Sequence, residues 1–291
     1  MFVPKKSIDV ECHTQYIGHR LRSLYLGAER KHCHQDWWVL GPNEIVFYME
    51  KLQKLHIQGA KIGRLHPKTF SARMPSKKTA LKELTFLNCD ISSHTVRQIL
   101  AFPEALTNFT IKGASLTPTI AAECRLSIRN CILELERSTS TGLEYLDLDI
   151  WNAETSSDFD CLDKLKHLTI SPQAIQGYAM ERDLRFTGRS LPVSLETLML
   201  KDFNKEGLPV ELLLTKVRDG LLPSLRTITY GTFYDEEDNE DGENDWKNEV
   251  KAFHKLGVEL SIARYQDPSA MPENENWPCK CWIYQHAASA W

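Results

Sequence analysis

The sequence lacks any long apolar run that could cross a lipid bilayer. Hydrophobic residues make up 42% of its 291 positions, but charged residues interrupt them before the roughly 20 apolar residues that a transmembrane helix needs. Met1 to Lys6 lead directly to Asp9 and Glu11, without the apolar core of a secretory signal. We therefore expect a protein with no membrane partner, located in the cytoplasm or the nucleus.

A strong excess of one charge is also missing. The net charge is −4, and residues 235–245 alone hold eight carboxylates and no base. The rest of the chain is therefore only slightly positive, short of the basic footprint of a nucleic-acid-binding protein. An EF-hand register with Gly242 at its sixth position places Asn248 where calcium requires a glutamate. We expect residues 235–245 to form a solvated acidic loop.

Recognisable catalytic and metal-binding motifs are absent as well. The sequence holds no nucleophile elbow, no glycine-rich phosphate loop and no His-Glu-x-x-His pair. Cysteine and histidine lie together at Cys12–His13, His32–His34 and Cys279–Cys281, but none of these groups supplies the four ligands of a structural zinc site. We therefore predict no catalytic residue, no cofactor and no metal, and a protein that is not an enzyme.

What the sequence does contain is a recurring Leu-x-x-Leu-x-Leu pattern with conservative replacements. Eight copies begin 22 to 37 residues apart, and a pattern with such a period is typical of repeat proteins. The copies are Leu21-Leu24-Leu26, Leu52-Leu55-Ile57, Leu81-Leu84-Phe86, Leu106-Phe109-Ile111, Leu143-Leu146-Leu148, Leu165-Leu168-Ile170, Leu195-Leu198-Leu200 and Leu225-Ile228-Tyr230.

Three copies extend to an eleven-residue template, over Leu52–Ile62, Leu81–Ile91 and Leu106–Leu116. Their ninth residue is small, as it must be to fit inside a bend, and their eleventh is apolar and returns to the core. The Leu-x-Leu part is a short strand with its leucines on one face. The template predicts an α/β fold, a leucine-rich-repeat solenoid with a curved parallel sheet on its concave side and helices and loops on its convex side.

The repeats also predict the positions of individual elements. Strands are expected near residues 24–26, 55–57, 84–86, 109–111, 146–148, 168–170, 198–200, 228–230 and 258–262. Helices are expected to begin near Pro42, Ser92, Thr117, Leu208 and Trp246, and residues 28–40 to form a loop. The same alternation of strand and helix suits a TIM barrel or another α/β fold. Polar residues between the strand leucines favour the open sheet, because strands buried on both faces have continuous apolar runs.

Two further features resemble the leucine-rich-repeat region of fungal F-box proteins, over about residues 20–265. One is the phrase Leu-Pro-x-Ser-Leu-Glu-x-Leu at residues 191–198, and the other is the ending of helix, Gly257-Val258 and strand. In that family an F-box binds the adaptor of a cullin-based ubiquitin ligase, and the repeats capture the substrate. Here no F-box precedes Leu21, and residues 40–45 only echo its opening at the place of an ordinary repeat helix. The resemblance thus implies substrate-type recognition, and a gene model truncated before Met1 is a further interpretation.

The domain organisation follows from these boundaries. We expect an N-terminal cap over residues 1–20, a domain of eight to nine repeats over 21–265 and a polar tail over 266–291.

The concave face is the predicted binding surface, because strand residues between the leucines point to it together. We expect a monomer that binds a protein partner there, with ubiquitin-ligase components among the candidates. The alternative is an enzyme or small-molecule binder on another α/β fold. The predicted contact residues are Tyr25, His56, Thr85, Leu87, Thr110, Asp147, Thr169, Met199 and Thr229.

Overall fold

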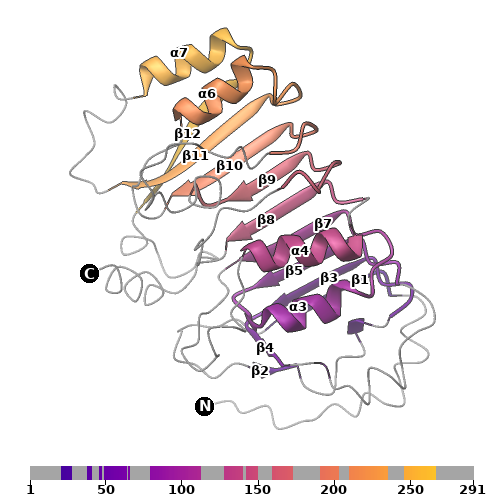
Figure 1. Cartoon of the computed structure of the whole chain (residues 1–291). Helices are drawn as coiled ribbons and strands as arrows, with labels where there is room; N and C mark the ends of the chain where they lie inside the picture. Colours follow the sequence, from indigo (N-terminus) through magenta and orange to yellow (C-terminus); the bar gives the residue numbers. More distant parts are fainter. Residues whose placement is uncertain are drawn as a thin grey trace, which may run out of the picture.

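The described residues form an α/β fold built on one nine-stranded parallel sheet (Figure 1). The computed structural model describes residues 21–27, 38–40, 46–47, 49–63, 65, 79–112, 128–139, 142–149, 159–172, 191–202, 210–234 and 246–266. The strands are β1 (Ser23–Gly27), β3 (Lys54–Gln58), β5 (Glu83–Leu87), β7 (Asn108–Lys112), β8 (Tyr145–Asp149), β9 (His167–Ile170), β10 (Thr197–Asp202), β11 (Thr227–Tyr234) and β12 (Glu259–Gln266).

The strands follow one another across the sheet in chain order, and every neighbouring pair is parallel. β1 and β12 form its two edges, so the sheet is open and not closed into a barrel. All nine predicted strand positions are confirmed, and so is the expectation of a parallel sheet. The predicted strand at residues 258–262 corresponds to β12, which begins one residue later and extends four residues further.

A second, small parallel sheet follows the turns at the carboxyl ends of two of the strands. It consists of β2 (Trp38–Val39), β4 (Ala60–Ile62) and β6 (Asp90–Ile91). Gly59 and Asn88 turn the chain from β3 to β4 and from β5 to β6, with left-handed φ angles of 67° and 49°. β2 lies within residues 28–40, which we expected to be a loop, so that expectation is wrong at its end. Two residues are too few to show the alternating pattern of a strand.

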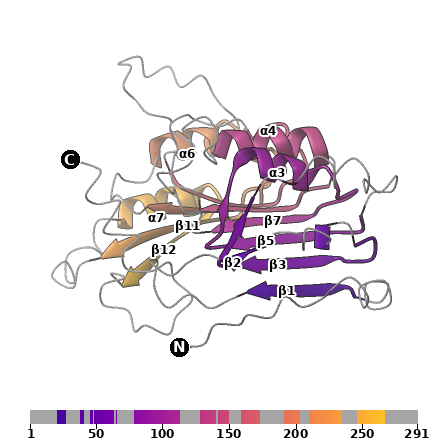
Figure 2. The ribbon, with the colours of Figure 1, turned by 90° about the horizontal axis from the view of Figure 1, so that it is seen from below.

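The α-helices among the described residues are α3 (Ser93–Leu100), α4 (Ile128–Thr139), α6 (Val210–Arg218) and α7 (Lys247–Lys255). All four cover the same face of the large sheet (Figure 2). α3 starts as the sequence predicts, because Ser92 Oγ accepts a hydrogen bond from the Thr95 N–H at 3.2 Å. α6 and α7 also match predicted helices. Near Pro42 only Val46 and Phe47 lie in a described turn, of the 3₁₀ type, and the start expected near Thr117 lies outside the described residues.

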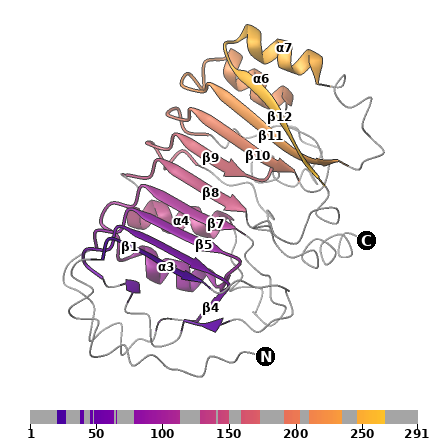
Figure 3. The same ribbon diagram turned by 180° about the vertical axis from the view of Figure 1, so that it is seen from behind.

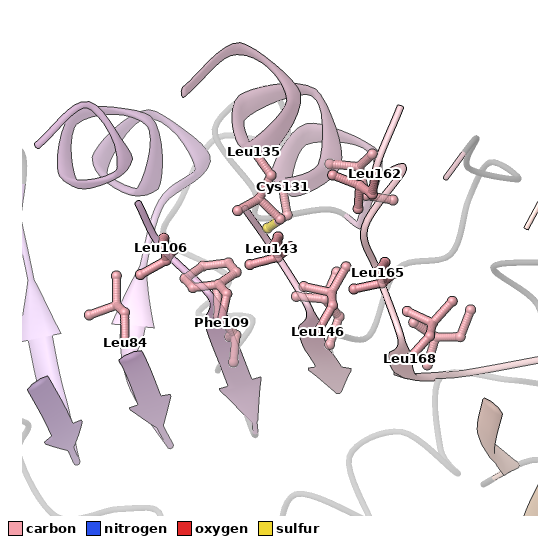
Figure 4. Close-up of a cluster of buried hydrophobic side chains, with 14 of the residues drawn as sticks. Leu84, Leu106, Phe109, Cys131, Leu135, Leu143, Leu146, Leu162, Leu165 and Leu168 are labelled. Atoms are coloured by element: carbon pink, nitrogen blue, oxygen red, sulfur yellow. The ribbon is translucent and has the colours of Figure 1, made fainter. Parts of the chain in front are cut away.

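The apolar core lies between the large sheet and the helices. Figure 4 shows side chains of the strands, such as Leu84 and Phe109, below Cys131 and Leu135 of α4. Two positions of each internal strand point to this side and are almost fully buried, as the alternation of strand side chains requires. They are Leu55, Ile57, Leu84, Phe86, Phe109, Ile111, Leu146, Leu148, Leu168, Ile170, Leu198, Leu200, Ile228 and Tyr230.

Each Leu-x-x-Leu segment is joined to the next one along the chain by the same pair of backbone hydrogen bonds, here called the junction between successive units. The carbonyl of Arg22, the second residue of its Leu-x-x-Leu segment, accepts the N–H groups of Gln53 and Lys54 at 2.8 and 2.9 Å. Each of these bonds fixes the start of the next strand against its predecessor. The same pair of hydrogen bonds is accepted by the carbonyls of Gln53, Lys82, Thr107, Glu144, Lys166 and Glu196.

Several expectations lie outside the residues that the structure describes. These are the N-terminal cap at residues 1–20, the acidic loop at 235–245 and the tail at 266–291 except for Gln266. In the described part of the chain, none of the helices has the length and apolar character needed to span a membrane.

Candidate functional site

The face of the large sheet opposite the helices is here called the open face (Figure 3). The strand register places the predicted contact residues on this face. Neighbouring strands align them in register, so that they form one continuous row, the central row. Leu87 lies in the adjacent row, two residues further along its strand. The central row reads Tyr25, His56, Thr85, Thr110, Asp147, Thr169, Met199, Thr229 and Ser261.

An aromatic group marks the β1 end of the open face. Tyr25 is 59% exposed, and its ring stacks on His56 with the ring centroids 4.5 Å apart. The Tyr25 hydroxyl donates a hydrogen bond to the side chain of Gln58, and Trp38 Nε1 donates one to the Gln58 carbonyl at 2.8 Å. Gly27 makes room for this ring, because an added Cβ would lie 2.7 Å from a Tyr25 ring carbon. Partial burial lowers the pKa of His56 and so favours its neutral form.

An ion-pair cluster occupies the middle of the open face. Lys112 Nζ of β7 lies 2.7 Å from Asp147 Oδ2 of β8, and Lys201 Nζ of β10 lies 3.8 Å from Asp147 Oδ1. The second distance exceeds that of a hydrogen bond, so it is a longer-range charge interaction. Asp147 therefore interacts with two lysines, which lie on strands on opposite sides of β8.

Two of the predicted contact residues are buried at this place. Asp147 is 2% exposed and Thr169 is 7% exposed, although the register puts both on the open face as expected. The expectation that they present their side chains to a partner is corrected. The alternation of a strand defines the face of a residue, but it does not show whether long side chains of other strands lie over it.

Three residues of a third row line the cluster and were missed as site residues. Tyr145 donates a hydrogen bond from its hydroxyl to Asp147 Oδ2 at 3.5 Å, and its ring centroid is 6.1 Å from that of His167. His167 Nδ1 lies 2.6 Å from Thr197 Oγ1 in a further hydrogen bond. Burial and the charge of Asp147 raise the pKa of Tyr145, which stays protonated at neutral pH. The sequence signal that could have identified these three residues is their spacing, because they lie two residues before Asp147, Thr169 and Met199 of the central row.

The remaining predicted residues are half-buried and small or apolar. Thr85 and Thr110 lie side by side in register, and Thr229 Oγ1 is 3.1 Å from Ser261 Oγ. Met199 and Leu87 are half-buried and apolar. A simple ion pair, Lys54 with Glu83 at 2.7 Å, flanks this part of the face. The open face thus offers hydrogen-bonding groups, a few anchors and one charged cluster.

Comparison with known proteins does not identify a function for this surface. Comparison finds no matching family model, curated protein or solved structure. Among the described side chains, no three His, Cys, Asp or Glu residues gather as a metal site would require. Burial raises the pKa of Cys89 to about 12 and that of Cys131 also upward, so neither thiol supplies the thiolate that a nucleophile needs. The chemistry on the open face is that of hydrogen bonding and ion pairing.

Proposed function

We propose that the chain is a leucine-rich-repeat solenoid that binds a protein partner on its open face and catalyses no reaction. The observation that carries the proposal is the identical junction between successive units, with seven carbonyls in equivalent positions each accepting two N–H groups. Such repetition is expected where each repeat contacts mainly its neighbours.

Two details of the eleven-residue template support the solenoid. The eighth residues, Gly59 and Asn88, both have left-handed φ angles, so the chain turns in the same way after β3 and β5. The ninth residues, Ala60 and Cys89, are 0% and 1% exposed inside the bend. Cys89 Sγ also donates a weak hydrogen bond to the Ile57 carbonyl of the preceding strand at 3.4 Å. A small side chain is therefore needed at this position.

The composition of the open face supports recognition of a protein. Broad faces of this kind suit extended partners, and a few aromatic, apolar or charged residues supply most of the binding energy in protein interfaces. Among the predicted residues of that type, Tyr25, His56, Leu87 and Met199 are not buried, whereas Asp147 is. Threonines such as Thr85 and Thr110 mainly provide a complementary surface.

The kind of partner follows from the resemblance to F-box proteins. In that family the repeat region captures a substrate of a cullin-based ubiquitin ligase, and we propose the same kind of capture here. The ligase adaptor itself is a second candidate partner. Its recovery with the chain would favour the ligase role.

The experiment is affinity purification from the native source with two four-residue variants. The first changes Tyr25, His56, Leu87 and Met199 to alanine and should lose the specific partners of the wild type. The matched control changes four exposed apolar residues outside the nine strands to alanine. These are Val193, Leu221, Val250 and Leu256, which are 62%, 53%, 37% and 37% exposed.

Circular dichroism would establish that both variants are folded before partners are compared by mass spectrometry. Loss of partners from the open-face variant alone supports the proposal. If that variant retains the same specific partners as the wild type, recognition on the open face is wrong.

A further inference from the structure

We propose that the partner places the guanidinium group of an arginine on the exposed ring face of Tyr25, at the β1 end of the open face. This rests on the proposed function and names one side chain of the partner and the place where it binds. Tyr25 is the contact residue in this proposal, and His56, Gln58 and Gly27 position its ring.

The ring of Tyr25 is held in one position by these three neighbours. One of its faces stacks on His56, with the ring centroids 4.5 Å apart and an angle of 24° between the ring planes. Its hydroxyl donates a hydrogen bond to the Gln58 side chain. Gly27 lies close to it, since a Cβ there would come within 2.7 Å of a ring carbon. A partner therefore meets a ring that is already ordered, and binding costs little further side-chain entropy.

The second face of the same ring is open to a partner. Tyr25 is 59% exposed, although one ring face and the hydroxyl are in contact with the protein. Among the described strands β1 forms the edge of the sheet, and β3, which carries His56, is its neighbour. The free ring face therefore points away from β3, past that edge. What the partner can reach is the flat aromatic face and not the hydroxyl group.

The electrostatic surroundings of the ring favour a cation. The face of an aromatic ring carries partial negative charge, which attracts cations and repels carboxylates and phosphates. On the open face of β1, β3 and β5, the described charged or titratable side chains besides Tyr25 are Lys54, His56 and Glu83. Lys54 and Glu83 form an ion pair with each other at 2.7 Å. Partial burial lowers the pKa of His56, so this ring is neutral at pH 7 and does not repel a cation.

Arginine fits this surface better than lysine does. Its guanidinium group is planar, stacks on aromatic rings and is less strongly hydrated than an ammonium group. Arginine and tyrosine are also enriched among the residues that contribute most to binding between proteins. A lysine keeps the charge of arginine and loses the stacking, whereas citrulline, its uncharged analogue, keeps the planar shape and loses the charge. These two analogues therefore separate the contributions of charge and shape.

The test follows the ring signals of Tyr25 and His56 by NMR in the full chain, isotope-labelled on its tyrosine and histidine rings. The two signals are assigned by their loss in Tyr25→Leu and His56→Phe. The probes are the N-acetyl amides of arginine, lysine and citrulline, added separately. Arginine should shift both signals saturably and bind about two- to fivefold more tightly than citrulline, the range expected for a cation on an exposed ring. Lysine should bind more weakly than arginine.

Variants show whether this preference for arginine over citrulline belongs to the ring, with His56 as the reporter. Tyr25→Leu should abolish the preference, whereas Tyr25→Phe keeps a ring and should retain it. Gly27→Ala brings a Cβ into the position of the ring and should weaken the preference. Leu221→Ala, which changes an exposed apolar residue outside the nine strands, should have no effect. Circular dichroism would establish that all four variants are folded.

The pH dependence of binding adds an independent readout. Protonation of His56 puts a positive charge behind the Tyr25 ring, so arginine binding should weaken as the pH falls from about 8 to about 5, where imidazole titrates and guanidinium does not. His56→Phe keeps a stacked ring and removes the titration. It breaks no hydrogen bond at Nε2, because that atom is buried without a partner. Binding of the arginine probe by His56→Phe, followed on the Tyr25 ring, should therefore be the same at both pH values.

Several outcomes would overturn the proposal. They are equal binding of arginine and citrulline by wild type, a preference for arginine that survives in Tyr25→Leu or is unchanged in Gly27→Ala, and a pH dependence that persists in His56→Phe. Tighter binding of adenosine than of the arginine probe would mean that the ring stacks on nucleic-acid bases. If these results appear while the open-face alanine variant still loses its partners in the purification, the proposed function stands and only the arginine contact is wrong.

Discussion

The thiols of Cys89 and Cys131 illustrate how far the fold changes the chemistry of single residues. Cys89 is 1% exposed and lies 3.4 Å from the carbonyls of Ile57 and Leu87. Burial raises its pKa from 9.0 to about 12, and the pKa of the fully buried Cys131 rises in the same direction. Both groups stay protonated in the folded chain at a pH where an unfolded chain would lose their protons.

This difference predicts a loss of stability at high pH. Between about pH 9 and 12 the unfolded chain binds fewer protons than the folded one, so the free energy of unfolding falls by about 1.4 kcal/mol per pH unit for each thiol. Below pH 9 the contribution is constant. The free energy of unfolding, measured by urea denaturation at several pH values, should fall less steeply with pH for Cys89→Ala than for wild type. Identical slopes would mean that the thiolate of Cys89 is tolerated in the fold.

Adjacent residues of β5 should differ strongly in their effect on stability. Leu84 is 1% exposed in the core, and Leu84→Ala should lower the free energy of unfolding by about 2–5 kcal/mol. Glu83 faces the other side and holds an exposed ion pair with Lys54, so Glu83→Ala should lower it by less than about 1 kcal/mol. Urea denaturation of both variants measures this. Similar losses would reverse the assignment of the two faces.

The candidate site could be predicted only in part at this scale. The period of the strands places Tyr25, His56 and Met199 on one face, and the register confirms that arrangement. The burial of Asp147 could not be predicted in this way. It depends on Lys112 and Lys201, which come from strands one and two places away and approach it through side-chain conformations that no local pattern encodes.

Among the elements, α7 ends with a motif that needs glycine. The N–H groups of Gly257 and Val258 bond the carbonyls of His254 and Phe253 at 3.0 and 3.1 Å, and Gly257 has a φ of 77°. This is a Schellman motif, and a left-handed residue other than glycine costs about 1–2 kcal/mol.

Gly257→Ala should therefore destabilise the protein by about that amount. An added Cβ meets no atom within 4 Å there, so the cost comes from the backbone alone. Gly142→Ala is the control, because its φ is not left-handed and its Cβ would make an ordinary contact at 3.5 Å with the Leu106 carbonyl. Thermal unfolding of the two variants tests this, and an equal shift in both would show that the turn after α7 is not the reason.

Strands were predicted more completely than the other elements because the leucine pattern repeats eight times in related form. α3, α6 and α7 were also predicted, each from a capping or amphipathic signal. β2 was not, since its two residues are held by pairing with β4 and carry no period of their own. Helix α4 was not predicted, although Cys131, Ile132 and Leu135 have helical spacing; the nearest expected helix start was Thr117.

Across the whole molecule, protection from hydrogen exchange should vary from the edge to the middle of the sheet. Leu24 and Leu26 of β1 are half-buried, whereas Leu55 and Ile57 of β3 are 1% and 0% exposed. Amides of β1 should exchange earlier than those of β5 and β7, because local opening requires less burial to be lost. Exchange followed by mass spectrometry tests this. Slow exchange in β1 would contradict this expectation.

The shared junction also determines where the chain can change its length. Equivalent leucines of successive units are 22 to 37 residues apart, yet the carbonyls of Thr107 and Glu144 make the same two bonds although the units that they begin differ in length. An insertion after a strand therefore leaves both neighbouring junctions intact. One extra residue between Glu144 and Leu146 would move every later side chain of β8 to the opposite face. Variants of this protein should thus accumulate insertions and deletions between strands and almost none at their starts.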